Sequence, residues 1–205
     1  MIPKELEIKI LEGFHNDETT FNLLDKKGEI KAGEYHPLMK KVHLDNAKML
    51  EPILLKYGFS GSCQAVNEAM FIIVQHAIND PVFMKKALVI MHNTPNIDPA
   101  YPAYLEDRLN FYARKPQRYG TQYTYTKAGK FTVWWLADSR EMVNQRRKHV
   151  GLVPMSENEK RFDFTPLGKE EALIAYNNQN AWLIETKWCT KQDILNYEKE
   201  KQGCI

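Results

Sequence analysis

The chain of 205 residues has only three cysteines, an odd number, and no CxxC pair. Because a disulfide framework needs paired cysteines and a zinc knuckle needs closely spaced ones, neither is indicated. No stretch approaches the roughly 20 apolar residues that cross a bilayer, and the first residues carry acids where a signal peptide has an apolar run. We therefore expect a cytoplasmic protein without a membrane segment, although export by a route that leaves no N-terminal signal stays open.

The sequence also lacks the motifs of several common enzyme classes: no P-loop, GxGxxG fingerprint, nucleophile elbow or HEXXH is present. Its formal net charge of +2 is too small to indicate nucleic acid as an obligatory partner. A basic groove for nucleic acid would have to run through Arg114, Lys115, Arg118 and 146–148, and salt-dependent binding would test it.

What the sequence does contain is a composition typical of a globular protein, with 43% hydrophobic and 26% charged residues. Hydrophobic periodicity predicts a mainly α fold: a helical, bundle-like domain with a small β-hairpin at about 122–135. Helices are expected at about 3–12, 17–24, 37–57, 63–79, 81–92, 100–114, 139–150, 169–188 and 191–202. The expected parts are an N-terminal helical segment (1–34), a core domain (35–160) and a C-terminal helical appendage (161–205).

Polar side chains interrupt the apolar faces of four predicted helices. They are His43 and Asn46, Gln75 and His76, Arg108, and Arg146 or Arg147. Because a buried polar group is costly unless it has a partner, helices packed on one core are expected to bring such groups together. The expected result is one pocket of histidine, arginine and carboxylate character, with the loop 117–122 at its mouth. The alternative is a polar core network that only specifies the fold.

Acid/base candidates come first from the histidines, since the pKa of an imidazole suits proton transfer near neutral pH. We expect His76 or His43 to be the general base or acid, oriented by a carboxylate. The carboxylate candidates are Asp80, Glu106 and Asp107. Asp80 also has the position of an N-cap for the helix that follows it, and the other two acids also fit a solvated helix face.

Substrate-binding candidates centre on arginine, because its planar fork matches the geometry of phosphate and carboxylate. The candidates are Arg108, Gln75, Asn46, Gln117, Tyr119, Gly120, Thr121, Gln122, Arg146 and Arg147. They predict a small, anionic ligand. The expected function is a hydrolase or transferase that acts on a phosphorylated or nucleotide-like substrate by acid/base-assisted transfer or hydrolysis.

Two alternatives stay open at this point. In the first, the chain is a non-enzymatic binding or interaction module whose polar core is structural. Its contact surface would be the exposed aromatics of the hairpin, which are Tyr123, Tyr125, Trp134 and Trp135. In the second, a metal ion binds His43, His76, Asp80 and Glu106, but the helix break at Pro81 disturbs the spacing of the second and third ligands. We therefore assign no metal site, and the cofactor is unknown.

An ordered series of motifs resembles a bacterial domain family of unknown function. The series is Tyr35-His36-Pro37, Met39, Val42-His43, Asn46, Gln75-His76-Ala77, Asp80-Pro81, Ala103-Tyr104-Leu105-Glu106-Asp107-Arg108, Pro116-Gln117-Arg118-Tyr119-Gly120-Thr121-Gln122, Val143, Arg146-Arg147 and Gly151-Leu152. The resemblance covers about 35–160, and its specificity lies in the order, chiefly YLEDR followed by YGTQ. It implies a largely helical domain with a small hairpin and no established reaction. The loop after the long helix differs from the family's GWPG, so specificity is expected to differ if that loop contacts substrate.

Overall fold

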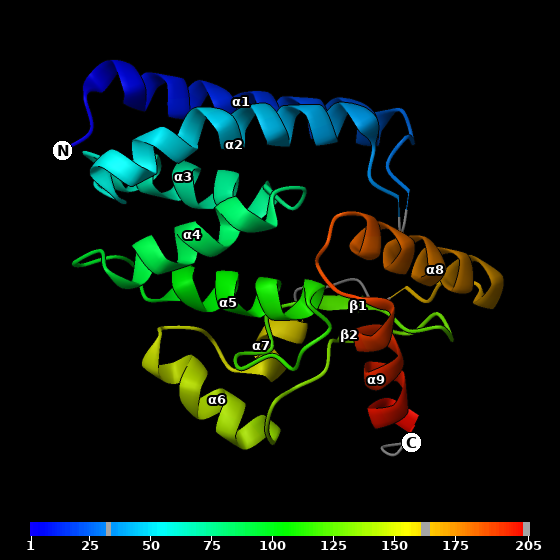
Figure 1. Ribbon diagram of the computed structural model, residues 1–205. Coiled ribbons are helices and arrows are strands. Elements are labelled where there is room, and N and C mark those ends of the chain that lie inside the picture. Colours follow the sequence, from blue (N-terminus) through cyan, green and yellow to red (C-terminus); the bar gives the residue numbers. More distant parts are fainter. Residues whose placement is uncertain (32–33, 161–164, 203–205) are drawn as a thin grey trace. The chain divides into compact units, whose positions relative to one another are not determined.

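The chain divides into two compact units, Met1–Ile97 and Asp98–Ile205, in a computed structural model that describes residues 1–31, 34–160 and 165–202. This division falls inside the range 35–160 that was expected to be one domain. Over the described residues the chain forms nine helices and one two-stranded hairpin, which confirms the mainly α prediction (Figure 1). None of the described helices is long and apolar enough to cross a membrane.

The first unit consists of four helices. They are α1 (Lys4–Lys26), α2 (Pro37–Tyr57), α3 (Gln64–His76) and α4 (Pro81–His92). Helices α1 and α2 lie side by side, α3 packs against both, and α4 packs against α2 and α3 (Figure 1). Each helix contributes fully buried side chains to a shared core, such as Ile10, Leu50, Met70 and Met84. This packing decides which polar side chains of the four helices meet.

Helix α1 corrects the prediction of two short helices at 3–12 and 17–24, because it runs without a break from Lys4 to Lys26. Gly13, a weak helix former, lies inside it. The side-chain amide of Asn46 on α2 donates to the Gly13 carbonyl oxygen at 2.9 Å. A Cβ atom on Gly13 would lie 2.7 Å from Asn46 Oδ1, so the glycine permits this close approach. Packing against α2 thus stabilises one long helix and places Asp17 on its buried face.

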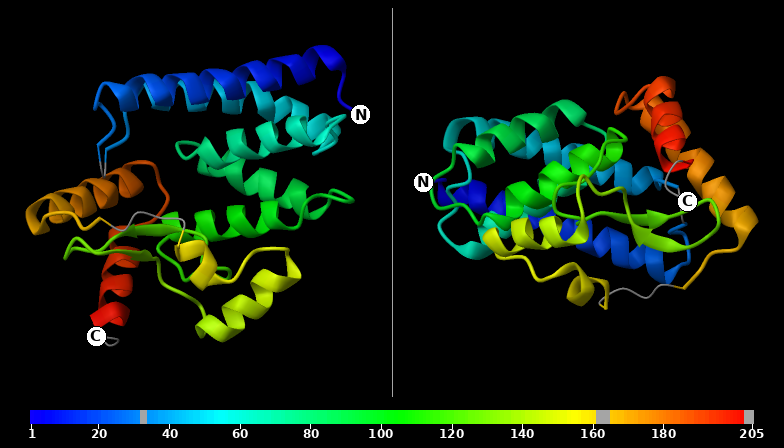
Figure 2. Two further views of the ribbon diagram at one scale, coloured as in Figure 1. Left: turned by 180° about the vertical axis from the view of Figure 1, so that it is seen from behind. Right: turned by 90° about the horizontal axis from the view of Figure 1, so that it is seen from below.

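The second unit combines five helices with the hairpin. Its helices are α5 (Ala100–Tyr112), α6 (Arg140–His149), α7 (Met155–Glu159), α8 (Lys169–Glu185) and α9 (Lys191–Gln202), and its strands are β1 (Tyr123–Tyr125) and β2 (Phe131–Val133). The strands pair antiparallel with Tyr123 opposite Val133, and Figure 2 shows the hairpin from below. Helix α7 is too short to leave a periodic signal, so it was not among the predicted helices. The predicted hairpin is confirmed.

Trp134, directly after β2, corrects the expectation of an exposed aromatic surface. Its ring stacks on Tyr197 of α9 with 4.1 Å between the centroids, and the residue is only 4% exposed. The other three hairpin aromatics, Tyr123, Tyr125 and Trp135, are half-buried. Helix α9 therefore covers part of the surface that the sequence suggested was open to a partner.

Candidate functional site

Three helices of the first unit bring an aspartate and two histidines together. Asp17 lies on α1, His43 on α2, and His76 is the last residue of α3. One nitrogen of each imidazole and one oxygen of the carboxylate all lie within 4.8 Å of one another. We call these three residues the Asp17 cluster. It contains both histidines predicted from the sequence and one acid that the sequence analysis missed.

Hydrogen bonds fix the orientation of both imidazoles. The Nε2 atom of His43 lies 3.1 Å from Asp17 Oδ1, and the Nδ1 atom of His76 lies 2.7 Å from Asp17 Oδ2. An ionised carboxylate can only accept, so each imidazole donates through the nitrogen that faces it. In neutral His43 the other nitrogen, Nδ1, then accepts from the hydroxyl group of Tyr35. The result is a continuous chain of hydrogen bonds from Tyr35 through His43 and Asp17 to His76.

Asp17 stays ionised although its side chain is only 2% exposed. Burial by itself would raise its pKa. The hydrogen bonds from His43 and His76 and the electrostatic attraction of the two imidazoles outweigh that effect, so the pKa of Asp17 lies well below its usual range. The two imidazole rings also contact each other, with 5.0 Å between their centroids. The cluster is therefore a compact group of one anion and two bases.

The Asp17 cluster lines a pocket of about 470 Å³ together with other residues of α1, α2 and the segment between them. His76 has 38% of its side chain exposed and His43 only 8%, so His76 is the more accessible imidazole. Among the described residues, the lining contributes three carboxylates, from Asp17, Glu18 and Glu34, and neither lysine nor arginine. The charge of this lining suits a cation better than a bare anion.

Of the remaining predicted site residues of the first unit, Asn46 and Asp80 serve its fold and Gln75 is buried. The amide of Asn46 binds the backbone of α1, as described above, and Gln75 is buried in α3 at 4% exposure. The backbone N–H of Phe83 donates to Asp80 Oδ1 at 2.9 Å, so Asp80 is the N-cap of α4. Asp80 thus has the capping role that the sequence offered as the alternative to a role in a site.

In the second unit, Asp107 of α5 binds the turn 118–121. Its carboxylate is fully buried and accepts from the backbone N–H groups of Arg118 (2.8 Å), Tyr119 (3.1 Å) and Thr121 (3.0 Å). The Thr121 hydroxyl also donates to it, at 3.1 Å. Burial raises the pKa of Asp107 above its ordinary value, and these hydrogen bonds oppose the rise only in part. Asp107 therefore fixes the backbone of the turn.

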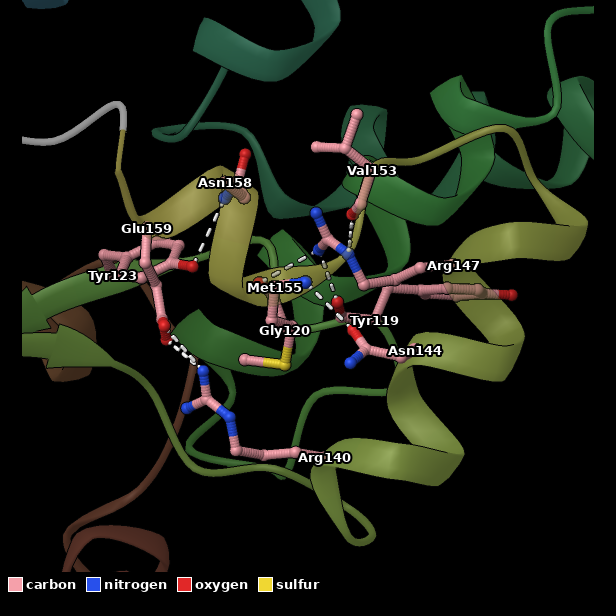
Figure 3. Close-up of polar contacts among 10 residues, drawn as sticks. All are labelled: Tyr119, Gly120, Tyr123, Arg140, Asn144, Arg147, Val153, Met155, Asn158 and Glu159. Atoms are coloured by element: carbon pink, nitrogen blue, oxygen red, sulfur yellow. Dashed lines mark hydrogen bonds and ion pairs between the residues drawn. The ribbon is translucent and has the colours of Figure 1, made fainter.

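Arg147 of α6 binds the same turn through its carbonyl groups (Figure 3). The side chain is 1% exposed. Its Nε donates to the Val153 carbonyl at 2.6 Å, and its Nη1 donates to the carbonyls of Tyr119 and Gly120 at 2.7 and 3.3 Å. Gly120 has a φ of +64°, a backbone conformation that favours glycine. Three backbone carbonyls thus accept hydrogen bonds from the guanidinium.

Gln117 and Gln122, at the two ends of the same turn, hydrogen-bond to each other. The side-chain amide of Gln117 donates to the Gln122 carbonyl at 3.0 Å and accepts from the Gln122 backbone N–H at 2.7 Å. The Nε atom of Arg108 donates to the Gln122 side-chain oxygen at 3.2 Å. Residues predicted to bind substrate therefore bind one another around 117–122.

Arg118 is held from two further sides. Its side chain forms an ion pair with Glu106 at 3.1 Å, and its carbonyl oxygen accepts from Arg146 Nε at 2.8 Å. Hydrogen bonds and ion pairs thus join predicted site residues into two sets, the Asp17 cluster within the first unit and a network around 117–122 within the second.

In comparisons with known proteins, no protein-family model, curated protein or solved structure matches the chain. The resemblance to a bacterial family of unknown function therefore stays a prediction.

The positions of the buried residues along α1 could have identified Asp17 as a buried acid. Ile10, Asp17 and Leu24 are seven residues apart and all three are buried. A spacing of seven residues returns to the same helix face. With one continuous helix in place of two short ones, Asp17 would have appeared as a carboxylate on an apolar stripe, as His43 and Asn46 do on α2.

Proposed function

We propose that the chain is an enzyme, a hydrolase or transferase, whose reaction centre is the Asp17 cluster. The observation that carries this proposal is the convergence of one carboxylate and two imidazoles from three helices at a pocket. Removing a charged carboxylate from water is costly unless it is paired. Groups of this kind concentrated in a cleft are typical of functional sites.

The cluster suits a reaction in which a water molecule or hydroxyl group must become a nucleophile. Hydrolysis and group transfer both need such activation near neutral pH, by a base or by a metal ion. The two imidazoles and the carboxylate supply the atoms for either route. Asp17 and Tyr35 hold the two rings in fixed orientations, so little reorganisation would precede the reaction.

For the substrate, we propose a phosphorylated or nucleotide-like molecule. The pocket volume of about 470 Å³ lies within the common range for small-molecule sites. The carboxylates of Glu18 and Glu34 on the lining oppose an anionic substrate. A phosphate group would therefore need a counter-cation at the cluster, because the described lining residues include neither lysine nor arginine.

A substrate panel tests the proposal. The full chain would be assayed with p-nitrophenyl esters of phosphate, of a phosphodiester and of acetate, and with nucleoside triphosphates. We expect activity on a phosphorylated member, with a loss of at least about 100-fold in Asp17→Asn and His76→Gln, the scale of a missing catalytic group. The matched controls Asp45→Asn and His92→Gln change exposed residues of the same unit and should keep full activity. Full activity in folded cluster variants would refute the proposal.

A second candidate function is binding without catalysis, and the second unit offers an observation for it. The hairpin, α8 and α9 form a pocket of about 350 Å³ that includes Tyr125, Trp134, Tyr176 and Tyr197. Aromatic walls of this kind are typical of ligand pockets. All four tryptophans of the chain lie in this unit, so tryptophan fluorescence would report a ligand there. Ligand-induced quenching without turnover by any panel member would favour this candidate.

A further inference from the structure

The separations within the Asp17 cluster are close to those between neighbouring ligands of a metal ion. Zinc binds histidine nitrogen and carboxylate oxygen at about 2.0–2.2 Å, which puts adjacent ligands about 3–3.5 Å apart. The two imidazole nitrogens lie 3.1 and 2.7 Å from the carboxylate oxygens of Asp17, and all three donor atoms fall within 4.8 Å. Side-chain adjustments that move His76 Nδ1 away from Asp17 and bring the more distant donor atoms closer would place all three groups around one ion.

We propose that Asp17, His43 and His76 bind one divalent transition-metal ion of the zinc type. Two imidazoles and one carboxylate are a donor set that suits zinc, iron(II) or cobalt(II), whereas magnesium and calcium prefer oxygen ligands alone. Three protein ligands leave at least one coordination position for water or substrate, which is the arrangement of catalytic rather than structural zinc sites.

Tyr35 provides the outer contact that such sites usually have. A histidine that binds a metal through one nitrogen normally donates its other N–H to an oxygen atom, which fixes the ring. With His43 Nε2 on the metal, its proton resides on Nδ1, and the Tyr35 oxygen, already in hydrogen-bond contact with Nδ1, accepts it. Without the ion, the Tyr35 hydroxyl donates to His43 Nδ1. With the ion bound, His43 Nδ1–H donates to the Tyr35 oxygen, so the same contact orients the ring in both states.

The charge of the pocket independently favours a cation. Glu18 and Glu34 line the pocket beside Asp17, and the described lining residues include no lysine or arginine to neutralise them. A divalent ion would offset two of the three negative charges of these carboxylates and offer a phosphate oxygen a coordination position that the lining alone does not have. The role of this ion in a reaction rests on the proposed function. Binding of the ion does not, because it is measured separately.

The test uses the full chain stripped with a chelator and then titrated with Zn²⁺ by calorimetry and with Co²⁺ by visible absorption. We expect one site, a Co²⁺ spectrum typical of nitrogen and oxygen ligands, and much weaker binding of Mg²⁺. Asp17→Asn, His43→Gln and His76→Gln should each weaken binding by at least about 100-fold, and Tyr35→Phe by about 10-fold. His92→Gln and Asp45→Asn, both exposed, should bind like the wild type.

The outcomes separate this inference from the proposed function. If the stripped wild-type protein binds neither Zn²⁺ nor Co²⁺, or binds them equally well in folded cluster variants, the inference is wrong. If that protein is nevertheless active and loses activity in Asp17→Asn, the proposed function stands without a metal. If the metal binds and the whole panel is inert, the site stands and the proposed function fails. Should a cluster variant not fold, the wild-type titration and Co²⁺ spectrum still decide.

Discussion

Asp17 and Asp107 are both almost completely buried aspartates, yet they have opposite surroundings. Asp17 accepts from two imidazoles at a pocket, and its pKa is lowered. Asp107 accepts from backbone N–H groups and one hydroxyl, and its pKa is raised because burial dominates. Backbone donors are part of the fold, whereas imidazoles can exchange a hydrogen bond for a proton, a metal ion or a substrate. The comparison assigns a structural role to Asp107 and leaves Asp17 as the candidate for chemistry.

Replacing Asp107 should have the largest effect on stability. In Asp107→Ala the three backbone N–H groups and the Thr121 hydroxyl lose their acceptor. Each unsatisfied buried donor costs about 1–3 kcal/mol, so we expect the free energy of unfolding to fall by more than about 3 kcal/mol. Urea unfolding followed by tryptophan fluorescence would measure it, since all tryptophans lie in the second unit. A loss below about 1 kcal/mol would contradict the structural role.

Arg147→Met should have the second-largest effect and lower the free energy of unfolding by about 2–3 kcal/mol. Three carbonyl groups lose a charged donor, while the apolar part of the side chain is kept. Asp107 and Arg147 hold the same turn from its N–H and C=O sides. Their double variant should therefore lose less than the sum of the single losses, since either change already releases the turn. Strict additivity in the same urea experiment would show that the two residues act independently.

Asp17→Asn should lower the free energy of unfolding by less than Arg147→Met does, about 1–2 kcal/mol. The variant loses charge-assisted hydrogen bonds with His43 and His76, but it also removes a buried charge, which offsets part of the loss. We expect the far-UV circular dichroism at room temperature to stay that of the wild type. Added Zn²⁺ should raise the melting temperature of the wild type and leave that of Asp17→Asn unchanged. A stability loss as large as that of Asp107→Ala would remove the distinction between the two aspartates.

Gly13→Ala should have the smallest effect on the free energy of unfolding. It tests the close contact between Gly13 of α1 and Asn46 of α2, the packing that places Asp17 on the buried face of α1. Alanine gains helix propensity of about 1 kcal/mol over glycine. The new Cβ would lie 2.7 Å from Asn46 Oδ1, so we expect a net loss of about 1 kcal/mol by thermal unfolding. In an Asn46→Ala background the contact is gone, and the same change should then stabilise the protein. A stabilising effect in both backgrounds would mean that the close approach of α1 and α2 carries no constraint.

Much of the fold could be predicted because helices follow from local periodicity. The helix at 37–57 and the proline-initiated helix at 81–92 appear as predicted, since caps and prolines mark their ends. The failure at α1 arose because Gly13 and the polar residues around it weaken the local signal, and the contact with Asn46 comes from another helix. Helix α7 has only five residues, too few for a periodic pattern.

The candidate site could be predicted only in part. His43 was recognised because it interrupts an apolar stripe on its own helix. Its partner Asp17 is 26 residues away, and the other bond of the cluster spans 59 residues to His76. No spacing rule covers such separations. The turn network shows the same limit, because the sequence marked Arg147 as a polar group on an apolar helix face and favoured an anionic ligand as its partner, whereas the structure gives it backbone carbonyls.

By itself, the sequence determined where most of the helices and the hairpin form, and it marked several polar side chains for burial, among them His43 and Arg147, because both follow from periodicity within one segment. Only the tertiary structure decided which buried groups became partners. It joined His43 and His76 to Asp17 and committed Arg147 to the backbone of a turn. The physical reason is that the cost of burying a polar group fixes the need for a partner, while the packing of remote helices fixes its identity.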